Sequence, residues 1–140
     1  MIDPGPLALL QAPNICIVGS LKKDGSPSTN PCWVSTDGEY LLLNSSYGRA
    51  WPKNLLRDAR VACTVINAEN MYEYATFWGF VEESTFEGAE DHIHELAKKY
   101  MGLDRYPFLL PGEQRIIFKV KPVKVFHLES EGEPPERDDL

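Results

Sequence analysis

Residues 14–44, NICIVGSLKKDGSPSTNPCWVSTDGEYLLLN, decide the fold because they contain two Asp-Gly pairs separated by the length of one strand. An Asp-Gly pair provides the positive φ angles that a tight hairpin turn needs. The runs over residues 14–21, 27–36 and 39–44 carry the apolar and β-branched residues typical of strands. The stretch therefore predicts a meander of three antiparallel strands. Pro31 cannot donate a ladder hydrogen bond, so we expect a sheet edge or a bulge there.

The rest of the chain is predicted to add strands and helices to this meander. The expected elements are a short helix over residues 4–11, a short helix over 52–57, strands over 61–67 and 72–83, a helix over 84–101 and a strand over 115–128. No βαβ period appears, which excludes a doubly wound sheet. We therefore predict a mainly β fold, a small antiparallel barrel of roughly six strands with one packed helix and short helices.

Two of these elements carry finer predictions. Strand alternation over residues 72–83 gathers four aromatic side chains on one face: Tyr72, Tyr74, Trp78 and Phe80. That face is either core or a dimer interface, or it is a wall beside a flat ring system. Gly79 indicates a bulge or a close approach of another backbone. Ser84 and Glu87 form the S-x-x-E pattern of a capping box, which predicts the start of the long helix.

Composition limits the class of protein. The chain has 140 residues and a net charge of −7, without an apolar run long enough to span a membrane. We expect one domain over residues 1–128, followed by an acidic tail, 129–140, without fixed structure. The acidic balance disfavours nucleic acid as a partner, and the N-terminal residues do not resemble a signal peptide. We therefore expect a cytoplasmic protein that binds neither nucleic acid nor membranes.

Cysteine and histidine patterns give no catalytic or metal-binding residue. Cys16, Cys32 and Cys63 each lie in an apolar run, and we expect buried, reduced thiols. His92 and His94 fall in a predicted helix, where side chains two residues apart diverge by roughly 200°, so they are not expected to share a metal. No Ser-His-Asp grouping or GxSxG motif is present.

The strongest functional signal is a cationic segment over residues 44–60, NSSYGRAWPKNLLRDAR. A loop of small polar residues leads there into a helix N-terminus, which attracts anions because of its free N–H groups and the positive end of the helix dipole. We expect Arg49 to reach a ligand from the loop and Lys53 from the first helical turn, whereas Arg57 and Arg60 serve the surface. The alternative is a solvated basic face without a ligand.

Four motifs in this part of the chain are similar to those of one known family. They are D-G-S-P at residues 24–27, P-x-W at 31–33, N-x-x-x-G-R at 44–49 and N-L-x-R-D-x-R-V at 54–61. With the later segments HELAKKYMGLDRYP and PGEQRIIFKVKPVKV, the chain resembles the pyridoxamine 5′-phosphate oxidase-like split β-barrel proteins over residues 14–125. Within them it is most similar to the deazaflavin (coenzyme F420)-dependent oxidoreductases.

The resemblance implies a split β-barrel of the FMN-binding type that forms a homodimer, with the cofactor at the subunit interface. The cofactor phosphate would lie near residues of the cationic segment: Asn44, Ser45, Ser46, Arg49 and Lys53. The ring would lie along the strand that carries Asn30, Pro31 and Trp33. The partner subunit would contribute the aromatic strand with Trp78 and the loop of Arg105 and Tyr106. The implied activity is hydride transfer between coenzyme F420 and a small unsaturated or aromatic substrate, and it requires no catalytic acid.

One position departs from the family pattern. Where the family reads G-R-x-K-x-R-N-L, residues 48–55 read GRAWPKNL, so Trp51 replaces a cation and Lys53 an arginine. A charge-assisted contact is worth about 1.5–3 kcal/mol, so Trp51 is expected to decide which cofactor fits. FMN is the alternative cofactor, in an FMN-dependent pyridoxamine 5′-phosphate oxidase-like enzyme. The other alternative is a non-catalytic binder of flavin, deazaflavin or haem.

Overall fold

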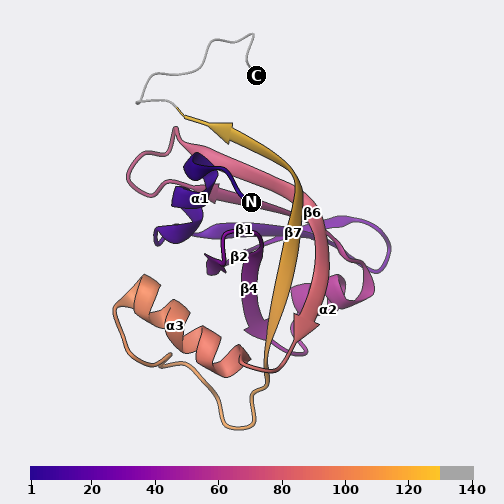
Figure 1. The fold of residues 1–140 in the computed structure, drawn as a ribbon. Helices are drawn as coiled ribbons and strands as arrows, with labels where there is room; N and C mark the ends of the chain where they lie inside the picture. Colours follow the sequence, from indigo (N-terminus) through magenta and orange to yellow (C-terminus); the bar gives the residue numbers. More distant parts are fainter. Residues whose placement is uncertain (130–140) are drawn as a thin grey trace.

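The computed structural model describes residues 1–129, which form seven strands and three helices (Figure 1). In chain order these are α1 (Pro4–Gln11), β1 (Cys16–Leu21), β2 (Pro27–Cys32), β3 (Val34–Thr36), β4 (Leu41–Ser46), α2 (Ala50–Arg57), β5 (Arg60–Ile66), β6 (Tyr74–Thr85), α3 (Ala89–Met101) and β7 (Arg115–Leu128). The predicted mainly β class is confirmed. The predicted acidic tail falls, from residue 130 onward, outside the described residues.

One antiparallel sheet contains all seven described strands, in the order β2-β1-β5-β6-β7-β4-β3. β2 and β3 lie at its opposite edges although only Trp33 separates them in sequence. The sheet must therefore curl until these edges approach each other, and the long β6 and β7 bend around the other strands in Figure 1. This curled sheet is the split antiparallel barrel that the sequence predicts.

The break at Trp33 corrects the predicted meander. Both Asp-Gly hairpins form, but the strand predicted over residues 27–36 divides into β2 and β3. Helix α3 holds the break, because the Trp33 indole stacks on the Tyr100 ring with centroids 5.1 Å apart and the Val34 N–H donates to the Tyr100 hydroxyl. Pro31 lies on β2, an edge strand, as expected.

The β6–β7 ladder runs past the predicted end of its first strand. Gly79 sits at a register shift, and a Cβ there would lie 1.8 Å from the Lys121 carbonyl oxygen, so the predicted close backbone approach is confirmed. Ser84 still pairs with Phe118 in this ladder and does not cap α3. The predicted capping box is therefore wrong, and α3 begins after Gly88, whose φ of 74° suits glycine.

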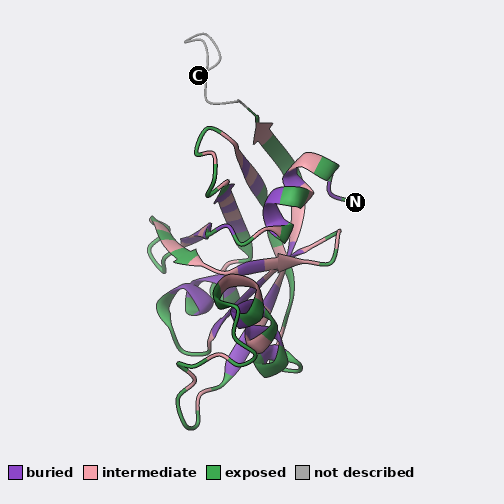
Figure 2. Ribbon diagram, turned by 90° about the vertical axis from the view of Figure 1, so that its left-hand side faces the viewer, coloured by how far each residue is buried: buried purple, intermediate pink, exposed green. Residues whose placement is uncertain are grey.

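The curled sheet encloses the apolar core, to which α1 and α2 contribute (Figure 2). On β6, Ala75 and Phe77 are buried, whereas Trp78 and Phe80 stay 42% and 40% exposed. The alternation predicted for this strand is confirmed, and its aromatic face is not core. None of the described helices is long and apolar enough to cross a membrane.

Candidate functional site

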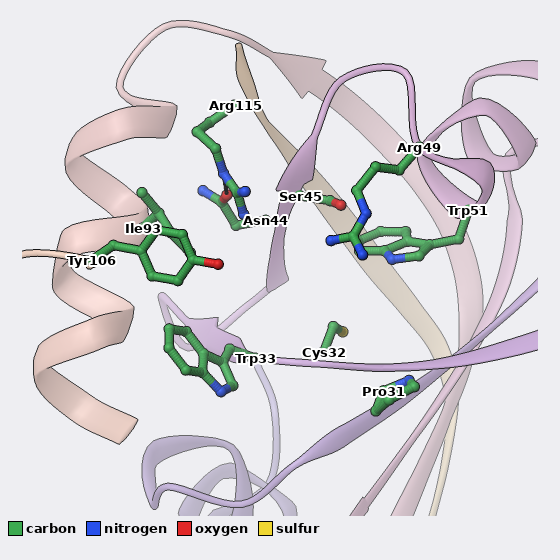
Figure 3. Close-up of a pocket in the computed structure, with 10 residues that line it drawn as sticks. All are labelled: Pro31, Cys32, Trp33, Asn44, Ser45, Arg49, Trp51, Ile93, Tyr106 and Arg115. Atoms are coloured by element: carbon green, nitrogen blue, oxygen red, sulfur yellow. Dashed lines mark hydrogen bonds between the residues drawn. The ribbon is translucent and has the colours of Figure 1, made fainter. Parts of the chain in front are cut away.

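A pocket of about 150 Å³ opens where β2, β4, α2 and α3 meet (Figure 3). Its lining residues are Pro31, Cys32, Trp33, Asn44, Ser45, Arg49, Trp51, Ile93, Tyr106 and Arg115. In Figure 3 the two arginines lie on opposite sides of the pocket, and each has its own neighbours. We call these sides the Arg115 wall (Asn44, Tyr106 and Arg115) and the Arg49 wall (Arg49 and Trp51).

Arg115, the first residue of β7, is only 8% exposed and is held on three sides. Its Nε donates to Asn44 Oδ1 at 2.9 Å, and its Nη1 pairs with Glu113 Oε1 at 3.0 Å. The Tyr106 ring covers the guanidinium, with 5.4 Å between Cζ and the ring centroid. Nη2 forms no hydrogen bond within residues 1–129, which leaves it available to a ligand in the pocket.

Asn44 extends these contacts from Arg115 into α3. The Arg115 N–H donates to Asn44 Oδ1, which fixes the orientation of the Asn44 amide group. Asn44 Nδ2 then donates to the Ala89 carbonyl at 2.9 Å and to His92 Nδ1 at 3.0 Å. His92 therefore carries its proton on Nε2, which donates to the Ser35 hydroxyl oxygen at 2.8 Å. The Arg115 wall thus rests on one continuous network of buried and partly buried hydrogen bonds.

His92 stays neutral in this network. Burial, followed by the positive charges of Arg115 and Lys99, lowers its pKa from 6.5 to about 4. Both ring nitrogens are already hydrogen-bonded, so neither is free to exchange a proton with a ligand. His92 therefore positions Asn44 and does not act as an acid or a base.

The segment after α3 brings Tyr106 over Arg115. The Tyr106 N–H donates to His94 Nδ1 at 2.9 Å, which ties this segment back to α3. The Trp33 ring meets the Tyr106 ring edge to face, with centroids 5.8 Å apart. Tyr106 therefore covers one side of the pocket from within the same chain.

Since His94 Nδ1 accepts a hydrogen bond, the His94 proton lies on Nε2. This Nε2 atom is buried without a hydrogen-bond partner within residues 1–129.

The Arg49 wall is built from one short segment. Arg49 is exposed and reaches the pocket from the N-terminus of α2 (Figure 3). No side chain caps α2. Pro52 has no N–H and the Lys53 N–H donates to the Arg49 carbonyl, so the N–H groups of Ala50 and Trp51 are the ones that stay open to an anion beside Arg49. Trp51 is buried and packs on Phe118, with ring centroids 5.8 Å apart. The position where the family pattern has a cation is therefore a fixed aromatic surface.

The pocket gathers only part of the predicted site. The predicted residues that line it are Pro31, Trp33, Asn44, Ser45, Arg49 and Trp51. The predicted residues that do not are Asn30, Ser46, Lys53, Trp78 and Arg105. Lys53 and Arg105 are exposed, and the Ser46 side chain interacts with Glu113. Trp78 lines a separate apolar groove over β1, β2, β5 and β6.

Four residues that line the pocket are not in the predicted set: Cys32, Ile93, Tyr106 and Arg115. The loop that carries Tyr106 was expected to come from the partner subunit. Cys16 and Cys63 are buried as expected, but Cys32 is only partly buried because it faces the pocket. Arg115 could have been identified from the sequence, because it directly precedes the apolar residues 116–118 at the start of a predicted strand. A charge at such a buried position needs a partner. Glu113, two residues earlier, is one such partner.

Comparison with known proteins agrees with this architecture. Among solved structures, an F420 reductase shares 26% sequence identity with a TM-score of 0.78, over 89% of this chain and 98% of that one. A Listeria innocua protein proposed to be a pyridoxamine 5′-phosphate oxidase shares 18% identity and a TM-score of 0.67, over 89% of this chain and 95% of that one. HupZ from Group A Streptococcus shares 18% identity and a TM-score of 0.64, over 96% of this chain and 100% of that one.

A search of curated proteins found no match. The family model described as pyridoxamine 5′-phosphate oxidase matches residues 6–129, which is most of the chain. The split barrel is the fold that these solved structures share with the chain. The chain belongs to the pyridoxamine 5′-phosphate oxidase family.

Proposed function

We propose that this chain is an oxidoreductase that binds coenzyme F420 in the pocket and transfers a hydride between this deazaflavin and a small unsaturated or aromatic substrate. The observation that carries the proposal is an arginine at an uncapped helix N-terminus, opening onto a pocket lined by aromatic rings. The 26% identity to an F420 reductase supports deazaflavin as the cofactor class.

The Arg49 wall suits the phosphate of such a cofactor. The Arg49 side chain forms no hydrogen bond or ion pair within residues 1–129, so its charge is not already engaged by a protein carboxylate. The open N–H groups of α2 add hydrogen-bond donors to the same place. Ser45 is buried at the adjacent end of β4 and offers a hydroxyl. These groups would bind a phosphate mainly through charge-assisted hydrogen bonds.

The tryptophan rings that line the pocket suit a flat ring system. Trp33 is fixed by its stacking on Tyr100, and Trp51 by its packing on Phe118. When bound, a deazaflavin supplies the hydride chemistry, so the protein's own residues bind and orient it and exclude water. Arg115 Nη2 would hydrogen-bond an oxygen of the ring or the substrate and stabilise negative charge there.

A homodimer is part of this proposal. Trp78 and Phe80 leave the outer face of β6 apolar, and Lys124 lies over the Trp78 ring, 5.5 Å from its centroid. A second copy covering this face would bury the apolar groove that Trp78 lines. Light scattering coupled to size-exclusion chromatography tests this point, and Trp78→Glu is expected to give a monomer. A monomeric wild-type protein would contradict the proposed homodimer.

Titration of tag-free protein with coenzyme F420 and with FMN tests the cofactor. We expect F420 to bind and Arg49→Ala to weaken binding at least tenfold, or about 1.4 kcal/mol. Lys53→Ala is the matched control, since Lys53 is a cation of the same helix that does not line the pocket, and its affinity should stay within about twofold of wild type.

The outcomes separate the alternatives. Tight binding of FMN without binding of F420 would contradict the proposal and favour the FMN-dependent enzyme. Equal affinities for wild type and Arg49→Ala would mean that the cationic segment is only a solvated face. Oxidation of reduced F420 in the presence of an enone or a quinone, measured by absorbance, would exclude a pure binder.

A further inference from the structure

We propose that Glu73, His127 and Glu129 form a binding site for a divalent transition-metal ion, with Zn²⁺ as the preferred ion. The site lies at the end of the β6–β7 ladder near α1, away from the pocket beside α3 (Figure 1). It is independent of the proposed oxidoreductase activity.

Strand register brings the three side chains together. Ala75 pairs with His127 and Tyr74 with Leu128, so continuing the ladder by one residue places Glu73 opposite Glu129. Residues two apart on a strand share a face, and residues directly opposite in an antiparallel pair do so as well. All three side chains therefore project from one face of the sheet. One potential ligand atom from each lies within 4.8 Å of the other two.

Two of the three ligands are held in position by the protein. Glu73 Oε1 accepts a hydrogen bond from Asn67 Nδ2 at 2.9 Å, which orients the carboxylate and leaves Oε2 directed at His127. A Cβ added to Gly5 would lie 2.5 Å from His127 Cε1, so the imidazole rests against the backbone of α1. The Glu73 and His127 side chains are only 18% and 20% exposed. Such outer contacts are typical of metal ligands.

The distances suit a small metal ion. His127 Nε2 and Glu73 Oε2 are 2.9 Å apart. Ligands bonded to tetrahedral Zn²⁺ at about 2.0–2.1 Å are separated by roughly 3.3 Å, so a small outward movement admits the ion. Two carboxylates supply the charge that balances a divalent cation. One imidazole with two carboxylates, and water in the fourth position, is a donor set that Zn²⁺ accepts.

Glu129 distinguishes a metal site from a simple hydrogen-bonded pair of side chains. The Glu73–His127 pair satisfies itself without a third group. Glu129 is exposed, and no hydrogen bond or ion pair of its side chain is formed within residues 1–129, yet its carboxylate lies beside the pair. A metal ion would give this second carboxylate a role and would join β7 to the segment that precedes β6.

Calorimetric titration of tag-free, chelator-treated protein with ZnCl₂ tests the proposal. We expect one Zn²⁺ per chain and a rise in Tm in its presence, because the ion binds the folded state. Glu129→Gln should weaken binding at least tenfold without changing the Tm of the metal-free protein. His127→Ala should abolish binding. Glu69→Gln, which changes an exposed carboxylate of the turn before Glu73, is the matched control and should bind as wild type does.

Glu129→Gln keeps the test decisive even if His127→Ala fails to fold, because Glu129 supports no other described contact. Absence of Zn²⁺ binding by the wild type would overturn the proposal. So would equal affinity in wild type and Glu129→Gln, since the ion would then be bound elsewhere, for example by the Cys32 thiol.

Discussion

The two walls of the pocket present an arginine each, but they are built in opposite ways. The Arg115 wall joins β4, β7 and the segment after α3, and the Arg115 side chain donates a hydrogen bond to Asn44 across 71 residues of sequence. The Arg49 wall comes from one segment, and its arginine is exposed. Arg115 is therefore fixed before a ligand arrives, whereas Arg49 is free to adapt to one. We expect the first arginine to govern folding stability and the second to govern binding.

The largest effect should follow removal of the fixed arginine. Arg115→Met keeps much of the side-chain volume but leaves Glu113, whose side chain is 12% exposed, without its cation and Asn44 Oδ1 without a donor. Breaking one partner of a buried ion pair typically costs about 3–5 kcal/mol, and we expect a loss in that range. Urea unfolding followed by circular dichroism measures it.

Arg49→Met is the matched control for that measurement. Because Arg49 is exposed and its side chain forms no hydrogen bond or ion pair within residues 1–129, its removal should change the free energy of unfolding by less than about 0.5 kcal/mol. Comparable losses in the two variants would mean that the walls do not differ in the way described.

The next effect concerns pH. The pKa of His92 is lowered from 6.5 to about 4 in the folded protein, so between these values the unfolded state binds the proton more readily. Stability is fully present above pH 6.5 and is lost as the pH falls toward 4, by up to about 3 kcal/mol. His92→Asn, which retains an acceptor near Asn44, should be less stable at neutral pH and should lose most of this slope.

Unfolding curves recorded at intervals from about pH 7 to pH 5 measure the slope above the range where carboxylates titrate. A wild-type protein whose stability is constant across that interval would show that His92 is protonated in the network without penalty, contrary to its burial beside Arg115 and Lys99.

The same contrast explains what the sequence could predict. The Arg49 wall could be predicted because its loop, its cation and the start of its helix are consecutive residues. The Arg115 wall could not, because nothing local joins Asn44, His92 and Arg115, and only the strand order places them together. Glu73 and His127, 54 residues apart, were missed for the same reason.

Local patterns failed where tertiary structure opposed them. Ser84 has the spacing of a capping residue, but the β6–β7 ladder includes it and pairs it with Phe118. The strand predicted over residues 27–36 broke at Trp33 because stacking on Tyr100 of α3 turns the chain toward the other sheet edge. Gly79, in contrast, was predicted correctly, since a glycine between two aromatic residues has few explanations other than a close backbone approach.

The smallest effect tests how much the contact of the Tyr106 ring with Arg115 contributes to stability. Tyr106→Leu removes the ring above the guanidinium but keeps the backbone N–H that donates to His94. A cation–π contact of this kind is worth about 0.5–2 kcal/mol, and we expect a loss of about 1 kcal/mol. Tyr106→Phe retains the ring and should stay close to wild type.

A double-mutant cycle between Tyr106→Leu and Arg115→Met isolates the contact between the ring and the guanidinium from other losses. We expect a coupling energy of about 0.5–1 kcal/mol, measured by urea unfolding. Zero coupling would mean that the Tyr106 ring is not fixed by Arg115 and is, like Arg49, free to adapt to a ligand. A measurable coupling would show that a segment lying outside any helix or strand is fixed by the buried arginine that it covers, so the rigid part of the pocket extends beyond the sheet and α3.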